Sequence, residues 1–130
     1  MTDRELLELA ARAAGIVSVK PELDSKKHGI CIGKRTMQWL TVYEEPVKYW
    51  NPLTDDGDAL RLAVKLMIRV SVNRAFRLSI PGSVTVEYPD RDGVYFALGE
   101  AVTNGDPYAA TRRATVRAAA EIGRQMEETK

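Results

Sequence analysis

Arg112 is the residue whose position in this sequence most suggests ligand binding. On a helix, at about 100° per residue, Arg112 falls between Tyr108 and Val116 and so lies inside an arc of apolar side chains. A guanidinium held there can bind a carboxylate or a phosphate through its planar fork of donors. The alternative is an arginine whose stem covers apolar surface while its head reaches solvent. Arg113 falls on the opposite face, where acidic neighbours favour a solvated, self-compensating surface over an anion site.

An aromatic segment is the second candidate for binding. Four of the nine aromatic residues fall within twelve positions: Trp39, Tyr43, Tyr49 and Trp50. Prolines at 46 and 52 make part of this segment irregular, which favours a loop surface. Exposed aromatic side chains can stack on bases or anchor a protein interface, although these four can equally form the core and its lid. We predict a binding surface formed by the four aromatic residues and the two arginines named above.

His28 and Cys31 are the residues best suited to metal or covalent chemistry, and their pattern supports neither. A structural zinc site needs four ligands, and the sequence offers no second pair. A catalytic thiolate would need an orienting group, which so short a separation in a strand does not favour. The glycines at 29 and 33 lack the remainder of either phosphate-binding motif. We therefore predict no catalytic residue, no metal site and no cofactor.

Asp55, Asp56 and Asp58 stand just before a helical pattern, where carboxylates accept hydrogen bonds from free backbone N–H groups. Their spacing does not match a calcium loop, so helix capping is the favoured interpretation. The alternative to a binding protein is an enzyme whose site assembles from residues far apart in the sequence. Its members would be His28, Cys31, Asp56 and Arg112.

The composition restricts the class of protein. With 130 residues, 45% hydrophobic and 28% charged, the chain suits one domain with one core, residues 1–130. A formal net charge of +1 gives no global attraction to nucleic acid, despite a local basic excess at Lys65, Arg69, Arg74 and Arg77. A single cysteine indicates a reducing compartment. The sequence has no signal peptide and no long apolar run, so we expect a cytoplasmic protein that does not engage a membrane.

A small set of helices and strands must position these residues. Capping and periodicity predict helices over residues 3–14, 55–66 and 108–126. Strands are predicted over 16–19, as a hairpin or two short strands within 30–42 with a turn at 33–35, over 67–72, and as a hairpin of 83–88 and 94–98. The predicted fold class is α+β: a helix/sheet/helix sandwich with a mainly antiparallel sheet and about three helices.

Two apolar faces should pack together in such a fold. The last helix gathers Tyr108, Val116, Ala118, Ala119, Ile122 and Met126 on one side, which should face the sheet. The strand over 67–72 places Ile68, Val70 and Val72 on one side and polar residues on the other, as expected of a half-exposed strand.

Three stretches carry a resemblance to a known family. They are residues 6–15, the stretch WNPLTDDGDALRLAVKL from Trp50 to Leu66, and DPYAATRRA from Asp106 to Ala114. These stretches resemble the phage ABA sandwich domain, a family of short phage and prophage proteins. The resemblance implies a helix, sheet, helix sandwich and a phage accessory gene expressed in the cytoplasm of an infected bacterium. It implies no activity and no set of site residues.

We therefore predict a phage-encoded, non-enzymatic accessory binding protein that acts in counter-defence or host takeover. It would block a bacterial protein or sequester a small anionic, nucleotide-like signal. A homo-oligomer that binds nucleic acid is a further alternative, which the near-neutral charge disfavours.

Overall fold

The computed structural model describes residues 1–18, 24, 29–32, 34–37, 40–42, 48–73 and 82–128. It contains the helices α1 (Asp3–Ala14), α2 (Asp56–Leu66) and α3 (Pro107–Glu128). Its strands are β1 (Ile30–Ile32), β2 (Lys34–Met37), β3 (Leu40–Val42), β4 (Lys48–Trp50), β5 (Arg69–Asn73), β6 (Ser83–Pro89) and β7 (Tyr95–Ala101). The α+β class, the three helices and the antiparallel pairing are confirmed, and the element order fits the predicted helix/sheet/helix arrangement.

The main sheet is an antiparallel meander of β5, β6 and β7 in chain order. Val70 lies opposite Val86, which lies opposite Leu98, so one face of the sheet is apolar across all three strands. The turn between β6 and β7 is built by Asp90, whose carboxylate accepts hydrogen bonds from the N–H groups of Asp92 and Val94 at 2.8 and 2.9 Å. This part of the prediction, the hairpin of residues 83–88 and 94–98, is confirmed.

The predicted hairpin within residues 30–42 is confirmed as β2 and β3, but the predicted turn at 33–35 is wrong and β1 pairs outside this stretch. β1 pairs with β4, and β2 pairs with β3, both antiparallel. Lys34 and Arg35 begin β2 instead of forming a turn. The partner of β1 lies beyond residues 30–42, so the local pattern could not identify it. Residues 16–18 form no strand, and the last residue of that predicted strand is outside the described residues.

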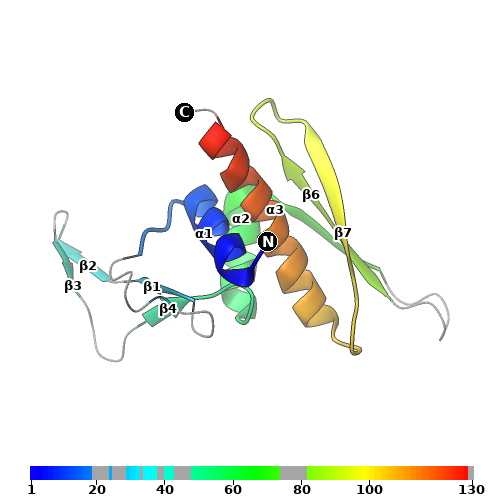
Figure 1. Ribbon diagram of the computed structural model, residues 1–130, viewed down its shortest axis with the longest axis horizontal. Helices are drawn as coiled ribbons and strands as arrows, with labels where there is room; N and C mark the ends of the chain where they lie inside the picture. The colour runs from blue at the N-terminus through cyan, green and yellow to red at the C-terminus, as the bar shows by residue number, and fades with distance from the viewer. Residues whose placement is uncertain are drawn as a thin grey trace.

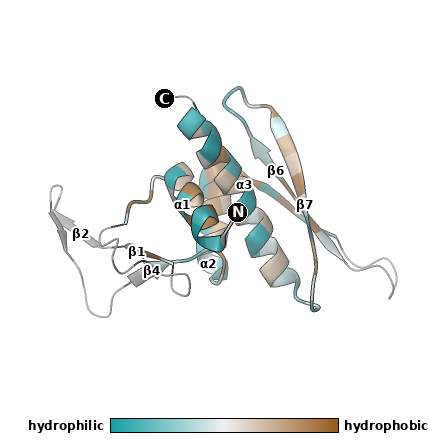
Figure 2. Ribbon diagram, viewed as in Figure 1, coloured by the Kyte–Doolittle hydropathy of each residue, from teal (hydrophilic) through white to brown (hydrophobic). Residues whose placement is uncertain are grey.

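Helix α3 lies between the sheet and the other two helices, as Figure 1 shows. Because it is covered on two sides, its buried positions are mostly small: Ala110, Ala114, Ala118, Ala119, Ala120 and Gly123. At Gly123 the backbones of α3 and α1 almost touch, since a Cβ there would lie 2.1 Å from the carbonyl oxygen of Leu9 on α1. Figure 2 shows hydrophobic and hydrophilic residues interspersed along the helices, as expected of amphipathic elements. None of the helices in the described residues is long and apolar enough to span a membrane.

The apolar side predicted for α3 is buried at its centre and exposed at its ends. The prediction that this side faces the sheet is wrong at Val116 and Ala119, which lie seven and four residues before Gly123 and so share the face of the helix that packs on α1. Val116, Ala118 and Ala119 are fully buried, and Ile122 packs against the core. Tyr108 is 66% exposed and Met126 42% exposed, because both lie outside the buried part of the helix, which runs from Ala110 to Gly123.

Candidate binding groove

Strand β5 is the strand of the main sheet that α3 covers least. Val84 and Val86 on the central strand are fully buried, whereas Val70 and Val72 on β5 are 39% and 57% exposed. The predicted buried side of this strand is therefore confirmed at Ile68, which is 8% exposed, and wrong at the two valines. A single helix lies over three strands, and the edge strand projects beyond it.

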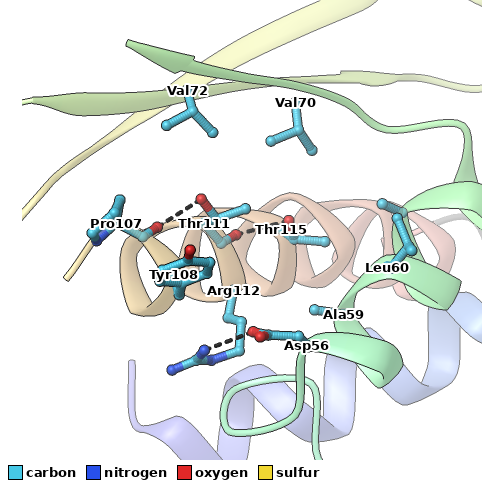
Figure 3. A pocket seen from close by; sticks show the side chains of 11 residues that line it. Asp56, Ala59, Leu60, Val70, Val72, Pro107, Tyr108, Thr111, Arg112 and Thr115 are labelled. Atoms are coloured by element: carbon cyan, nitrogen blue, oxygen red, sulfur yellow. Dashed lines mark hydrogen bonds and ion pairs between the residues drawn. The ribbon is translucent and has the colours of Figure 1, made fainter. Parts of the chain in front are cut away.

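The exposed valines form one wall of a groove between β5, α2 and α3. Figure 3 shows Val70 and Val72 pointing from the strand toward α3, which forms the floor. Residues Ala59, Leu60 and Ala63 of α2 form the opposite wall. The groove has a volume of about 550 Å³. This volume lies within the range of about 300–1,000 Å³ that small-molecule sites occupy.

Two threonines on the floor of the groove add apolar surface. The hydroxyl of Thr111 donates to the carbonyl oxygen of Pro107 at 2.7 Å, and that of Thr115 donates to the carbonyl oxygen of Thr111 at 2.8 Å (Figure 3). Each hydroxyl is thereby used by the helix backbone. The groove is consequently lined almost entirely by carbon.

Arg112 provides the charged end of the groove. Its Nε donates to the carbonyl oxygen of Leu53 at 2.9 Å, and its Nη1 lies 2.7 Å from Oδ1 of Asp56. The Arg112 side chain is 18% exposed and the Asp56 side chain 68% exposed. An ion pair with so exposed a partner contributes only about 0–1 kcal/mol. Arg112 thus lies at the edge of a groove, as the binding hypothesis requires, but already holds a carboxylate.

The N-terminus of α2 determines which acid reaches Arg112. Asp55 caps the helix, because its carboxylate accepts from the N–H of Asp58 at 2.8 Å. Asp58 accepts from the N–H of Asn51 at 3.0 Å and pairs with Arg61 at 2.7 Å. The predicted capping role of this acidic run is confirmed. Asp56, the first residue of the helix, is left to face Arg112.

The predicted aromatic surface does not join this groove. Trp50 is 5% exposed and belongs to the hydrophobic core, so its predicted place on an exposed binding surface is wrong. The reason is that β4 pairs with β1, which turns Trp50 inward opposite Ile30. Tyr49 is half-buried and lies opposite Cys31 instead of lining the groove. Trp39 and Tyr43 are outside the described residues.

Arg113 lies on a different side of α3 and links elements of the fold. Its Nη1 is 3.0 Å from Asp3 of α1, and its Nε is 3.9 Å from Glu100 of β7. Arg117 also reaches Glu100, at 2.5 Å, and the carbonyl oxygen of Gly99, at 3.0 Å. These arginines hold the helix to its neighbours, and Arg113 does not line the groove.

The alternative set of catalytic residues is not brought together. Asp56 and Arg112 meet, but Cys31 is fully buried away from them, and His28 is outside the described residues. Within the described part of the chain, no group of three or more His, Cys, Asp or Glu residues could hold a metal ion. Of the predicted basic excess, Arg69 stacks over the ring of Tyr95 at 3.8 Å.

Sequence reasoning missed the residues that form the groove walls. A signal for them exists in α2, which buries Ala59, Leu62 and Ala63 but also carries Leu60, Val64 and Met67 on its surface. These last three recur at spacings of four and three residues and so form a second apolar stripe. A helix with apolar residues on more of its circumference than one contact can bury indicates a second partner. No protein-family model, no curated protein and no solved structure matches this chain, so the resemblance to the phage family stays a prediction.

Proposed function

We propose that this protein is a non-enzymatic binding protein that holds a small, largely apolar molecule in the groove between β5, α2 and α3. The observation that carries this proposal is the exposure of Val70 and Val72 on the apolar face of the sheet. Their counterparts on β6 are fully buried. Apolar side chains left exposed around a concave surface are typical of ligand sites.

The charge of the groove supports an apolar ligand over a nucleotide. Arg112 is the cation at the groove, and the carboxylate of Asp56 already neutralises it at 2.7 Å. A polyphosphate needs several cations or backbone N–H groups, and the described residues of the lining include one cation, Arg112. The nucleotide-like ligand predicted from the sequence is therefore the less favoured member of the small-ligand class.

The chemistry of the lining supports binding without turnover. Among the described residues of the lining, the polar groups are one ion pair, the phenol of Tyr108, and two hydroxyl groups that donate to helix carbonyls. A nucleophile needs a neighbouring base to activate it, and the described lining residues do not pair the two. A binding role needs nothing more than the shape and the apolar surface.

A protein partner is the second candidate, and the outer surface of α2 favours it. Val64 and Met67 are both 71% exposed next to the groove but do not line it. A partner segment seated in the groove could also cover these two residues, as when an amphipathic helix binds in a groove. This candidate corresponds to the blocking of a bacterial protein. The phage setting of either function rests on the sequence resemblance alone.

A fluorescent probe without charge tests the small-ligand proposal. N-phenylnaphthylamine should bind the wild-type protein at one site, and Val72→Asp should weaken its binding by about tenfold or more, because the apolar probe would then cover a carboxylate and remove it from water. Val94→Asp is the matched control, since Val94 is 56% exposed and Val72 57% exposed, but Val94 lies in the β6–β7 turn. Equal affinity for all three proteins would rule out the groove as the site. Val64→Asp should weaken binding of a protein partner while leaving the probe unaffected.

A further inference from the structure

We propose that the carboxylate of Asp56 pairs with Arg112 until the anionic group of a ligand displaces it. The groove would then select ligands with one anionic group at the end of an apolar body. This inference rests on the proposed function, because it names the ligand class of the same groove. It depends on a difference between the contacts of two side chains, Arg112 and Asp56. Arg112 is anchored to the backbone, whereas Asp56 is not.

The guanidinium of Arg112 is held in place without help from Asp56. Its Nε donates to the backbone carbonyl oxygen of Leu53 at 2.9 Å, and its side chain is mostly buried. Among the described residues, Nη2 has no hydrogen-bond partner, and Nη1 contacts Asp56 alone. The head group would therefore remain at the groove if Asp56 turned away. A preoriented cation of this kind loses little freedom when a ligand binds.

Asp56 is the one acid of its cluster that is free to leave. Asp55 and Asp58 accept hydrogen bonds from backbone N–H groups, and both lie near Arg61. Within the described residues, the carboxylate of Asp56 has one hydrogen-bond and ion-pair partner, Arg112. Because it is 68% exposed, it can exchange this contact for water at small cost.

A ligand anion could then replace the Asp56 carboxylate. A carboxylate or sulfonate can take Nη1 and reach Nη2 as well, in the bidentate geometry that arginine favours. Its apolar body would lie between Val70 and Val72 on one side and the alanines of α2 on the other. A neutral ligand would leave Asp56 in place and gain nothing from Arg112. A ligand with several charges would meet the displaced carboxylate of Asp56 and, among the described lining residues, find no second cation.

Two probes with the same ring skeleton test this inference. N-phenylnaphthylamine is neutral, and anilinonaphthalene sulfonate carries one sulfonate on the same two ring systems. In fluorescence titrations of the wild-type protein, the sulfonate should bind about tenfold more tightly, as expected of a charge-assisted bidentate contact. Asp56→Asn should increase its affinity by about fivefold further, since the competing anion is removed. Asp56→Asn should not alter the affinity of the neutral probe.

Two further variants complete the test. Arg112→Met should remove the preference for the sulfonate, and Arg112→Lys, which keeps the charge but loses the fork, should retain part of it. Asp92→Asn is the control for a change of charge, because Asp92 is exposed in the β6–β7 turn. The inference is overturned if both probes bind equally to the wild type, or if Asp56→Asn and Asp92→Asn have the same effect. The proposed function survives that result if Val72→Asp still weakens the neutral probe, and fails if it does not.

Discussion

At the scale of single residues, Arg112 joins three parts of the chain that are far apart in the sequence. It belongs to α3, donates to residue 53 and reaches the first residue of α2. The helical pattern was enough to predict that Arg112 lies among apolar side chains. It could not predict the two acceptors, because they come from segments 59 and 56 positions away. Contacts over such distances depend on how the helices pack and not on local spacing.

Gly123 allows a prediction about a single residue. Gly123→Ala should destabilise the protein by about 3 kcal/mol or more, because the new Cβ would lie 2.1 Å from a backbone oxygen that cannot turn aside. Gly99→Ala is the control, since the nearest atom to a Cβ there is 3.9 Å away and the backbone is not in the left-handed region. Its effect should stay below about 1 kcal/mol in urea unfolding. Similar losses for the two variants would show that the helices can move apart.

At the scale of elements, the helices were predicted better than the strands. The bounds of α1 match the prediction, and those of α2 and α3 differ from it by one or two residues. Capping residues mark helix ends locally, as Thr2 does through its hydrogen bonds with Glu5 at 2.8 and 3.2 Å. Strand pairing is not local. The partner of β1 is β4, and the intervening β2 and β3 pair with each other.

The start of α2 allows a prediction at this scale. Asp58→Ala should lower the free energy of unfolding by about 1–3 kcal/mol, because it removes the acceptor of the N–H of buried Asn51 and the partner of Arg61. Asp92→Ala, on the exposed turn, should change it by no more than about 0.5 kcal/mol. Chemical denaturation of both variants measures the difference. Equal effects would mean that the chain before α2 is held by other contacts.

At the scale of the whole molecule, the groove results from a mismatch between layers. The sheet has three strands, and α3 lies mainly over β6 and β7, so the apolar face continues beyond the helix at Val70 and Val72. The sequence predicted an apolar side for β5 correctly, but the pattern of a strand cannot show whether a helix lies over it. The predicted binding surface rested on aromatic residues, because exposed aromatic side chains often anchor interfaces. The groove is lined instead mainly by aliphatic residues. Their exposure depends on how the helices and the sheet pack, so the sequence pattern could not predict it.

The contact between the sheet and the C-terminal part of α3 should make stability depend on alkaline pH. Burial, and to a lesser extent the nearby carboxylate of Glu121, raises the pKa of Tyr88 above its ordinary value of 10.0, and Arg124 opposes this shift. A raised pKa in the folded state means that stability is complete below about pH 10 and falls as the pH rises toward the pKa of the folded protein. Above this pH, the free energy of unfolding measured in urea should therefore fall more steeply for the wild type than for Tyr88→Phe. Parallel curves for the two proteins would contradict the assignment, and Glu121→Gln should give an intermediate slope.

The close approach of α1 and α3 at Gly123 also bears on how relatives of this protein could be found. Most surface positions can diverge until sequence comparison fails, but position 123 accepts no side chain while the two helices cross as they do. Gly29 is under a similar constraint, since a Cβ there would lie 2.2 Å from the carbonyl oxygen of Trp50 and its φ is +91°. A distant relative that keeps this fold should retain both glycines, together with small residues at most of the buried positions of the last helix. A search built on these spacings would look for the packing of the helices and not for similarity along the chain.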